Sequence, residues 1–159
     1  IPTVLVAFFG KGDLQSGKKI KEPEFATVVQ RLKAAAPQAQ AAGVTLAVEN
    51  LLSAEQNLRL LDAVGSDAIR LYYDVFNIGK SMGYDVPAEI LRLKGRIAQI
   101  HFKNGPKYLD EDKPFFETAA AAIKAIDYRG WIVLETSSPS KNGVADARRN
   151  GDFARSLFA

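Results

Sequence analysis

The chain alternates between short apolar runs and longer stretches of mixed character. Five of the apolar runs are rich in β-branched and aromatic residues and have the length of buried β-strands. These predicted strands cover residues 2–9, 44–49, 69–74, 97–103 and 131–136. Apolar residues along the whole length of a strand indicate that both faces of the sheet are covered.

Each predicted strand is followed by a segment with helical start and stop signals. Pro23 and Gly43 flank the first helix, and Ser53 and Gln56 have the spacing of a capping box before the second. Asp85 can cap the third helix, whereas Pro37 is expected to kink or interrupt the first. The predicted helices cover residues 24–42, 54–64, 85–93, 114–126 and 145–157, and residues 11–23 are predicted to form a loop.

This order predicts an α/β fold with parallel strands and right-handed crossovers. At 159 residues the chain fits one domain with a sizeable core. An open dinucleotide-binding sheet is disfavoured, because Gly10-Lys11-Gly12 only begins the required glycine pattern, and no phosphate-binding loop motif is present.

Composition narrows the class of protein further. Without cysteine there are no disulfides, Cys-ligated zinc sites or iron–sulfur clusters. The net charge is only +3 and is dispersed, apart from residues 18–21, so a solvated loop explains that cluster better than nucleic-acid binding. No apolar run has the length of a membrane span. We expect a cytoplasmic location, and we expect neither nucleic acid nor a membrane as a partner.

Four side chains mark the ends of the predicted strands. Glu49, Asp74 and Glu135 end the second, third and fifth strands, and the fourth carries His101, the only histidine in the chain. Their spacings of 25, 27 and 34 residues each equal one strand-plus-helix unit. Because active sites of parallel barrels lie at the carboxyl ends of the strands, these side chains can converge on one point.

Three carboxylates brought together would repel one another, and a divalent cation removes that conflict. An oxygen- and imidazole-rich ligand set suits manganese, magnesium, cobalt or zinc, and leaves positions for substrate oxygens. The sequence therefore predicts one divalent-metal site.

These residues stand in motifs that resemble a known superfamily. The segments Val48-Glu49-Asn50, Tyr73-Asp74, Ile100-His101 and Leu134-Glu135 are similar to the sugar phosphate isomerase/epimerase superfamily, the xylose isomerase-like barrels. The resemblance implies a (βα)8 TIM barrel whose strands five to eight carry the four ligands. Residues 1–159 would then be the C-terminal five βα units of a single domain, and the sequence begins at Ile1, so we expect strands one to three elsewhere.

Two positions depart from the superfamily's patterns. Asn104 stands where strand seven often has an acid after His-x-Lys, and Asn77 stands where ketose 3-epimerases tend to have a histidine. Endonuclease IV, a distant member, needs several further histidines for its zinc cluster, which argues against a role in DNA repair.

The resemblance implies an isomerase or epimerase that acts on a small sugar, keto-sugar or hydroxy-ketone through an enediolate. Glu49 and Glu135 would exchange the proton, while Asp74 and His101 would mainly hold the metal. Lys103, two residues beyond His101 and on the same side of the strand, is a candidate substrate-binding residue, and Asn50 and Asn77 are weaker ones. The alternatives are a dehydratase of a cyclic polyol such as an inosose, and a metal-free binding or scaffold homologue; a homo-oligomer is compatible with each.

Overall fold

The computed structural model describes residues 2–159 and contains one five-stranded sheet. The strand order is β1-β4-β5-β6-β7, and β4 pairs in parallel with both β1 and β5. The sheet strands are β1 (Thr3–Ala7), β4 (Thr45–Glu49), β5 (Ile69–Asp74), β6 (Ile97–Phe102) and β7 (Trp131–Leu134). The helices are α1 (Glu22–Ala41), α2 (Ala54–Val64), α3 (Val86–Arg92), α4 (Lys113–Ala125) and α5 (Gly143–Ser156). The predicted α/β class is confirmed, with five parallel strands of a barrel that has eight when complete.

The chain divides into two compact units. The first extends to Tyr73 and includes Gly95–Gln99, and the second comprises Asp74–Lys94 and Ile100–Ala159. That residues 1–159 belong to one barrel domain stays a prediction.

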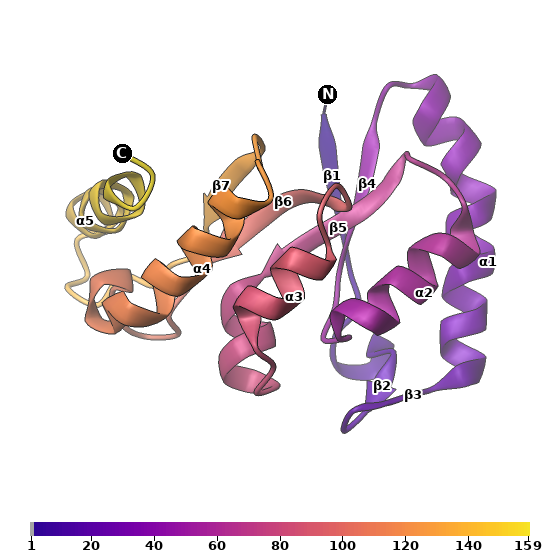
Figure 1. Cartoon of the computed structure of the whole chain (residues 1–159), viewed down its shortest axis with the longest axis horizontal. Coiled ribbons are helices and arrows are strands. Elements are labelled where there is room, and N and C mark those ends of the chain that lie inside the picture. Colours follow the sequence, from indigo (N-terminus) through magenta and orange to yellow (C-terminus); the bar gives the residue numbers. More distant parts are fainter. Residues whose placement is uncertain (1) are drawn as a thin grey trace. The chain divides into compact units, whose positions relative to one another are not determined.

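In the first unit, α1 and α2 pack side by side next to β4 (Figure 1). The predicted capping box is present at the start of α2, where Ser53 accepts from Gln56 N, and Gly65 ends the helix in the left-handed conformation. The interruption of α1 expected at Pro37 does not occur. Pro37 lies on the exposed side of an unbroken helix, where the helix tolerates its missing N–H more easily than it would in the core.

The prediction of a plain loop for residues 11–23 was wrong. This segment contains a 3₁₀ turn, η1 (Gly10–Gly12), and a two-stranded hairpin formed by β2 (Gln15–Ser16) and β3 (Lys19–Ile20). Gly17 has a φ of 64°, which a residue with a side chain rarely adopts. Leu14 is buried beside the hairpin, so one apolar side chain anchors a segment whose composition is otherwise polar.

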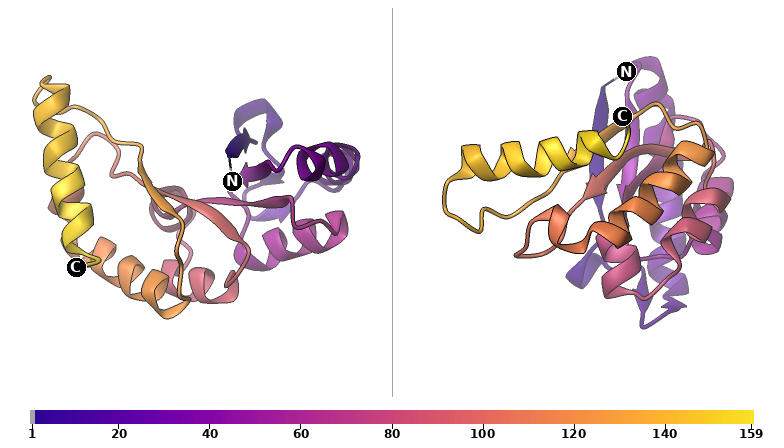
Figure 2. Two further views of the ribbon diagram at one scale, coloured as in Figure 1. Left: turned by 90° about the horizontal axis from the view of Figure 1, so that it is seen from above. Right: turned by 60° about the vertical axis from the view of Figure 1, so that its left-hand side comes forward.

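In the second unit, a cluster of phenylalanines joins the strand layer to the helices. The rings of Phe102 and Phe116 lie 5.2 Å apart, and Phe116 also meets Phe153 of α5 edge to face at 6.2 Å. Phe158 contacts Phe102 at 6.4 Å, and Figure 2 shows this end of α5 beside α4. Such pairs add about 0.5–1.5 kcal/mol each beyond the area that they bury.

The π-helical segment η2 (Asn77–Ser81) of the second unit packs so closely against neighbouring side chains that position 79 requires a glycine. A Cβ on Gly79 would lie 2.8 Å from both a Phe115 ring carbon and Val86 Cγ2. We expect Gly79→Ala to lower the free energy of unfolding of the full-length protein by about 1–3 kcal/mol, the usual cost of overpacking. Urea denaturation checks this, with Gly143→Ala as the control, because a Cβ there meets nothing within 4 Å. Equal unfolding midpoints for the two variants would contradict the packing.

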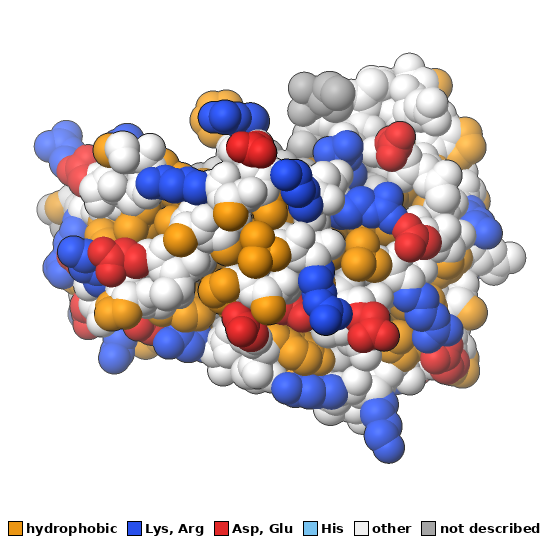
Figure 3. All heavy atoms as spheres, viewed as in Figure 1, with side chains coloured by type: hydrophobic (Ala, Val, Ile, Leu, Met, Phe, Trp, Pro, Cys, Tyr) orange, Lys and Arg blue, Asp and Glu red, His pale blue; other side chains and the backbone are white. Residues whose placement is uncertain are grey.

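The face drawn in Figure 3 carries charged side chains of both signs, and its Lys and Arg side chains are interspersed with Asp and Glu. Within residues 2–159, no helix is both long and apolar enough to cross a bilayer.

Candidate metal centre

Asp74, the last residue of β5, is held in one orientation by the chain that follows it. Its side chain is fully buried, and Oδ1 accepts a hydrogen bond from the backbone N–H of Asn77 at 2.9 Å. This bond closes a turn of the kind that Asp commonly stabilises, at the entrance to η2. It leaves Oδ2 directed toward Lys103, whose Nζ lies 3.3 Å away.

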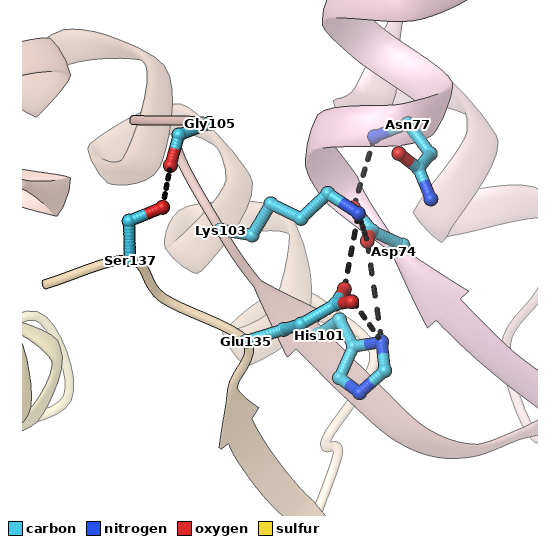
Figure 4. Close-up of polar contacts among 7 residues, drawn as sticks. All are labelled: Asp74, Asn77, His101, Lys103, Gly105, Glu135 and Ser137. Carbon is cyan, nitrogen blue, oxygen red and sulfur yellow. Dashed lines mark hydrogen bonds and ion pairs between the residues drawn. The ribbon is translucent and has the colours of Figure 1, made fainter. Parts of the chain in front are cut away.

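β6 contributes two side chains to the same place because residues two apart point to one side of a strand. His101 is nearly buried, and its Nδ1 lies 3.9 Å from Asp74 Oδ2 and 3.6 Å from Glu135 Oε2. Lys103 follows on the same side (Figure 4). Phe102, between them, packs against Phe116 in the core.

Glu135 lies one residue past the last residue of β7. Its backbone N–H donates to Phe102 O at 3.1 Å, so the contact between the two strands continues to this position. Its Oε2 accepts a hydrogen bond from Lys103 Nζ at 3.0 Å. Its side chain is 51% exposed, whereas those of Asp74 and His101 are 0% and 8% exposed. Of these three predicted ligands, Glu135 is therefore the most accessible to a substrate.

Lys103 is the counter-ion of this group of side chains. Partial burial works to lower its pKa, but the hydrogen bond to Glu135 and the charges of Asp74 and Glu135 outweigh that effect and raise the pKa. The ammonium group therefore stays charged at neutral pH.

The residues fit a divalent metal by position and by chemistry. Asp74, His101 and Glu135 each offer a ligand atom, and these atoms lie within 4.8 Å of one another. Metal–ligand bonds of about 2.0–2.2 Å need only small side-chain movements to be made from such spacing. Carboxylate oxygens with one imidazole suit manganese, magnesium, cobalt or zinc, but not a metal that demands sulfur.

The remaining predicted site residues are placed as follows. Glu49 is the last residue of β4, belongs to the first unit and is buried. Asn50 is buried as well, where its amide donates to Asn57 Oδ1 and accepts from Leu52 N. These two bonds give Asn50 a structural role in its loop. Asn77 begins η2 and contributes its N–H to Asp74, and substrate binding by either asparagine stays a prediction.

One buried carboxylate was missed by the sequence reasoning. Asp146, in the first turn of α5, is 4% exposed and accepts hydrogen bonds from Ser138, Ser140 and Tyr108. The bonds from Ser138 and Ser140, with a further one from Tyr108, outweigh the effect of burial and lower its pKa from 3.8 to about 2. In the sequence Asp146 resembles any acidic residue near the N-terminus of a helix, where a negative charge is favourable. Only the serines that precede it indicate that its carboxylate is hydrogen-bonded.

The depressed pKa makes a prediction about acid stability. Because the pKa of Asp146 is about 2 in the folded state and 3.8 as the ordinary value, its ionised form stabilises the fold above about pH 4. That contribution is lost as the pH falls from about 4 to 2. We expect the difference in urea midpoint between the wild type and Asp146→Asn to shrink across this range. A difference that stays constant from pH 5 to pH 2 would contradict the assignment.

The comparisons with known protein families and with solved structures agree on the fold of this chain. The family model described as xylose isomerase-like TIM barrel matches residues 3–157. A solved L-ribulose 3-epimerase superposes with a TM-score of 0.80 at 23% identity, over 99% of this chain and 62% of its own. For a D-psicose 3-epimerase solved with D-fructose, the TM-score is 0.72 at 14% identity, over 99% and 62% of the two chains.

A D-allulose 3-epimerase from Methylomonas sp., solved with D-allulose, has a TM-score of 0.65 at 21% identity, over 91% of this chain and 55% of its own. The chain thus spans about three fifths of the length of these structures, and at such identities the likeness shows the fold alone. No protein of curated function matches the sequence.

Proposed function

Because the chain belongs to the xylose isomerase-like TIM barrel family, we propose that the whole protein is a divalent-metal-dependent sugar isomerase or epimerase. The observation that carries the proposal is the convergence of Asp74, His101 and Glu135 from three successive strands. The similar structures support the class of reaction, since three of them are named as 3-epimerases of ketoses. The proposed substrate is accordingly a small keto-sugar or hydroxy-ketone.

We propose Glu49 as the fourth metal ligand. It ends β4 as Asp74 ends β5, and β4 and β5 are parallel neighbours in the sheet, so both acids belong to its carboxyl end. When bound, the metal supplies positive charge that polarises the substrate carbonyl and stabilises negative charge developing on its oxygen. This set of three carboxylates and one imidazole suits manganese, magnesium, cobalt or zinc.

The proposed proton transfer rests on two glutamates, the half-exposed Glu135 and the buried Glu49. Glu135 is the accessible carboxylate, so it can take or return a proton at the carbon beside the carbonyl, with Glu49 as its partner in the other direction. Lys103 orients the Glu135 carboxylate through its hydrogen bond to Oε2, and its ammonium can bind a substrate oxygen. Asp74, whose Oδ1 is held by the backbone N–H of Asn77, and His101 serve as ligands only. Return of the proton to the same carbon from the opposite face gives epimerisation, and return to the neighbouring carbon gives isomerisation.

A metal-free binding or scaffold protein is the second candidate. The observation that favours it is the double ion pair of Lys103 with Asp74 and Glu135, which already compensates two carboxylates without a metal. A dehydratase of a cyclic polyol would share the first proton abstraction but then expel a hydroxyl group. A cytoplasmic location and a homo-oligomer stay predictions.

The test is solvent-proton exchange with the full-length protein loaded with Mn²⁺ or Co²⁺. Ketoses and inososes are incubated in D₂O, and deuterium at the carbon beside the carbonyl is followed by NMR together with the products. We expect deuterium incorporation accompanied by an epimer or isomer. A dehydrated product would instead establish the lyase, and a protein that takes up no metal and exchanges no proton would establish the second candidate.

A further inference from the structure

The two loops that follow β6 and β7 are tied to one another. The first of them leads from Lys103 to Tyr108, and the second leads from Glu135 to Asn142. Ser137 of the second loop donates a hydrogen bond to the carbonyl of Gly105 in the first at 2.7 Å (Figure 4). The segments next to two of the predicted ligands, His101 and Glu135, are therefore linked directly.

The start of α5 holds the same two loops from the other side. Asp146 Oδ1 accepts from the Tyr108 hydroxyl at 2.7 Å and from Ser140 Oγ at 2.6 Å. Its Oδ2 accepts from Ser138 Oγ at 2.6 Å and from Ser140 N at 3.1 Å. One buried carboxylate thus joins Tyr108, which follows β6, to the loop that follows β7.

Asp146 is itself fixed in place by neighbouring contacts along α5. Asn150 is fully buried and its Oδ1 accepts from Leu109 N at 2.9 Å. Arg149 makes two hydrogen bonds of 2.9 Å to Asp110, a bidentate pair that is directional as well as strong. Three consecutive residues after Lys107 are therefore fastened to α5, so Asp146 offers a rigid anchor rather than a mobile side chain.

The loop after Glu135 is tied to other elements mainly by Asp146 and by the bond between Ser137 and Gly105. Residues 137–145 are all exposed, so burial of apolar surface contributes little to their order. Glu135 itself is half exposed, and its carboxylate is positioned by Lys103 and by the path of the chain that follows it. A ligand of this kind needs support from the groups behind it to stay within about 0.5 Å of its working position.

We propose that Asp146 is a positioning residue for the metal centre: by clamping residues 138–140 to Tyr108, it holds Glu135 at the distance from His101 and Asp74 that a divalent metal requires. The inference rests on the proposed metal site and extends it to a residue that contacts none of the ligands. Removal of a group that hydrogen-bonds a ligand directly typically weakens metal affinity by about 10–100-fold, and Asp146, one contact further out, should act at the lower end of that range.

The experiment compares Co²⁺ binding by the full-length wild type and Asp146→Asn. Co²⁺ is titrated while its visible absorption spectrum is recorded, because the spectrum reports the geometry of the ligands. We expect an affinity about 10-fold lower, with an altered spectrum. Amide hydrogen exchange over residues 136–141 should become faster in the variant. Asp152→Asn is the matched control, because Asp152 lies on the same helix, is exposed and is paired to Arg155.

A milder variant keeps the test decisive if Asp146→Asn folds poorly. Tyr108→Phe removes one donor only, and we expect it to weaken Co²⁺ binding by about 3-fold, roughly the effect of one hydrogen bond. If these variants show faster exchange in the loop but keep the affinity and spectrum of the wild type, Asp146 is structural and the inference is overturned. If the wild type itself binds no Co²⁺, the proposed metal site fails first, and the inference fails with it.

Discussion

Glu135→Gln in the full-length protein is expected to lower kcat for proton exchange on the proposed ketose substrate by about 10³-fold. The reason is that the carboxylate is both the accessible proton carrier and a proposed metal ligand, and loss of general acid–base catalysis alone costs about 10²–10⁴-fold. The amide is nearly isosteric with the acid, so the fold should be retained. Deuterium exchange from D₂O measures the effect independently of product release.

Glu117→Gln provides the matched control for this substitution. Glu117 is 50% exposed and ion-paired to Lys113, so it resembles Glu135 in exposure and in having a lysine partner. It lies on α4, and its substitution should leave kcat within about 2-fold, as surface changes usually do. Equal kcat values for Glu135→Gln and the wild type would remove Glu135 from the mechanism.

Asp74→Asn is expected to weaken divalent-metal affinity by about 10²-fold or more. Asp74 is the most deeply buried of the proposed ligands in the second unit, and its Oδ1 already accepts a hydrogen bond from Asn77 N. Only Oδ2 is directed toward His101 and Lys103, so replacing it with an amide nitrogen takes away the atom that would bind the metal. This exceeds the loss expected for outer groups, because a ligand atom itself is removed.

The affinity is measured by calorimetric titration of Mn²⁺ into each full-length variant. Asp112→Asn is the control, because Asp112 also forms an ion pair with a lysine, Lys80, at 2.6 Å. If loss of a surface ion pair were enough to disturb the site, both variants would bind Mn²⁺ weakly. Wild-type affinity in Asp74→Asn would show that Asp74 is a turn residue and not a ligand.

The elements that were predictable from the sequence are those whose signals are local. Ser53 with Gln56, and Gly65 after them, define α2 by backbone chemistry that needs no tertiary context. Asp85 caps α3 by accepting from Ala88 N for the same reason. The strand ends at Glu49 and Asp74 were placed correctly because a charged residue interrupts a continuous apolar run.

The features that escaped prediction depend on contacts between distant residues. The hairpin of β2 and β3 has only two residues per strand, so it lacks the periodicity that reveals longer strands. The π-helical turn after Phe76 depends on packing of Gly79 against Phe115, far along the chain. The clamp at Asp146 joins three segments, and nothing in the sequence shows that Tyr108 reaches it.

The candidate site lies between these two cases. The spacing in the sequence was enough to predict that Asp74, His101 and Glu135 lie at one end of the sheet, because successive parallel strands end on the same side. The ion pairs of Lys103 with two of those carboxylates could not be foreseen, since they depend on side-chain orientation. Lys103 balances the charge of two carboxylates, as a bound metal ion would. The two proposals therefore differ in whether the site binds a metal, and metal content is the decisive measurement.

That measurement is the metal content of the full-length protein, determined by elemental analysis after purification and again after equilibration with Mn²⁺ and removal of free ions. The proposed site predicts one divalent ion per chain in the wild type and almost none in Asp74→Asn. Wild-type protein that retains no divalent ion after equilibration would contradict the central claim and leave Lys103 as the resident cation of the site.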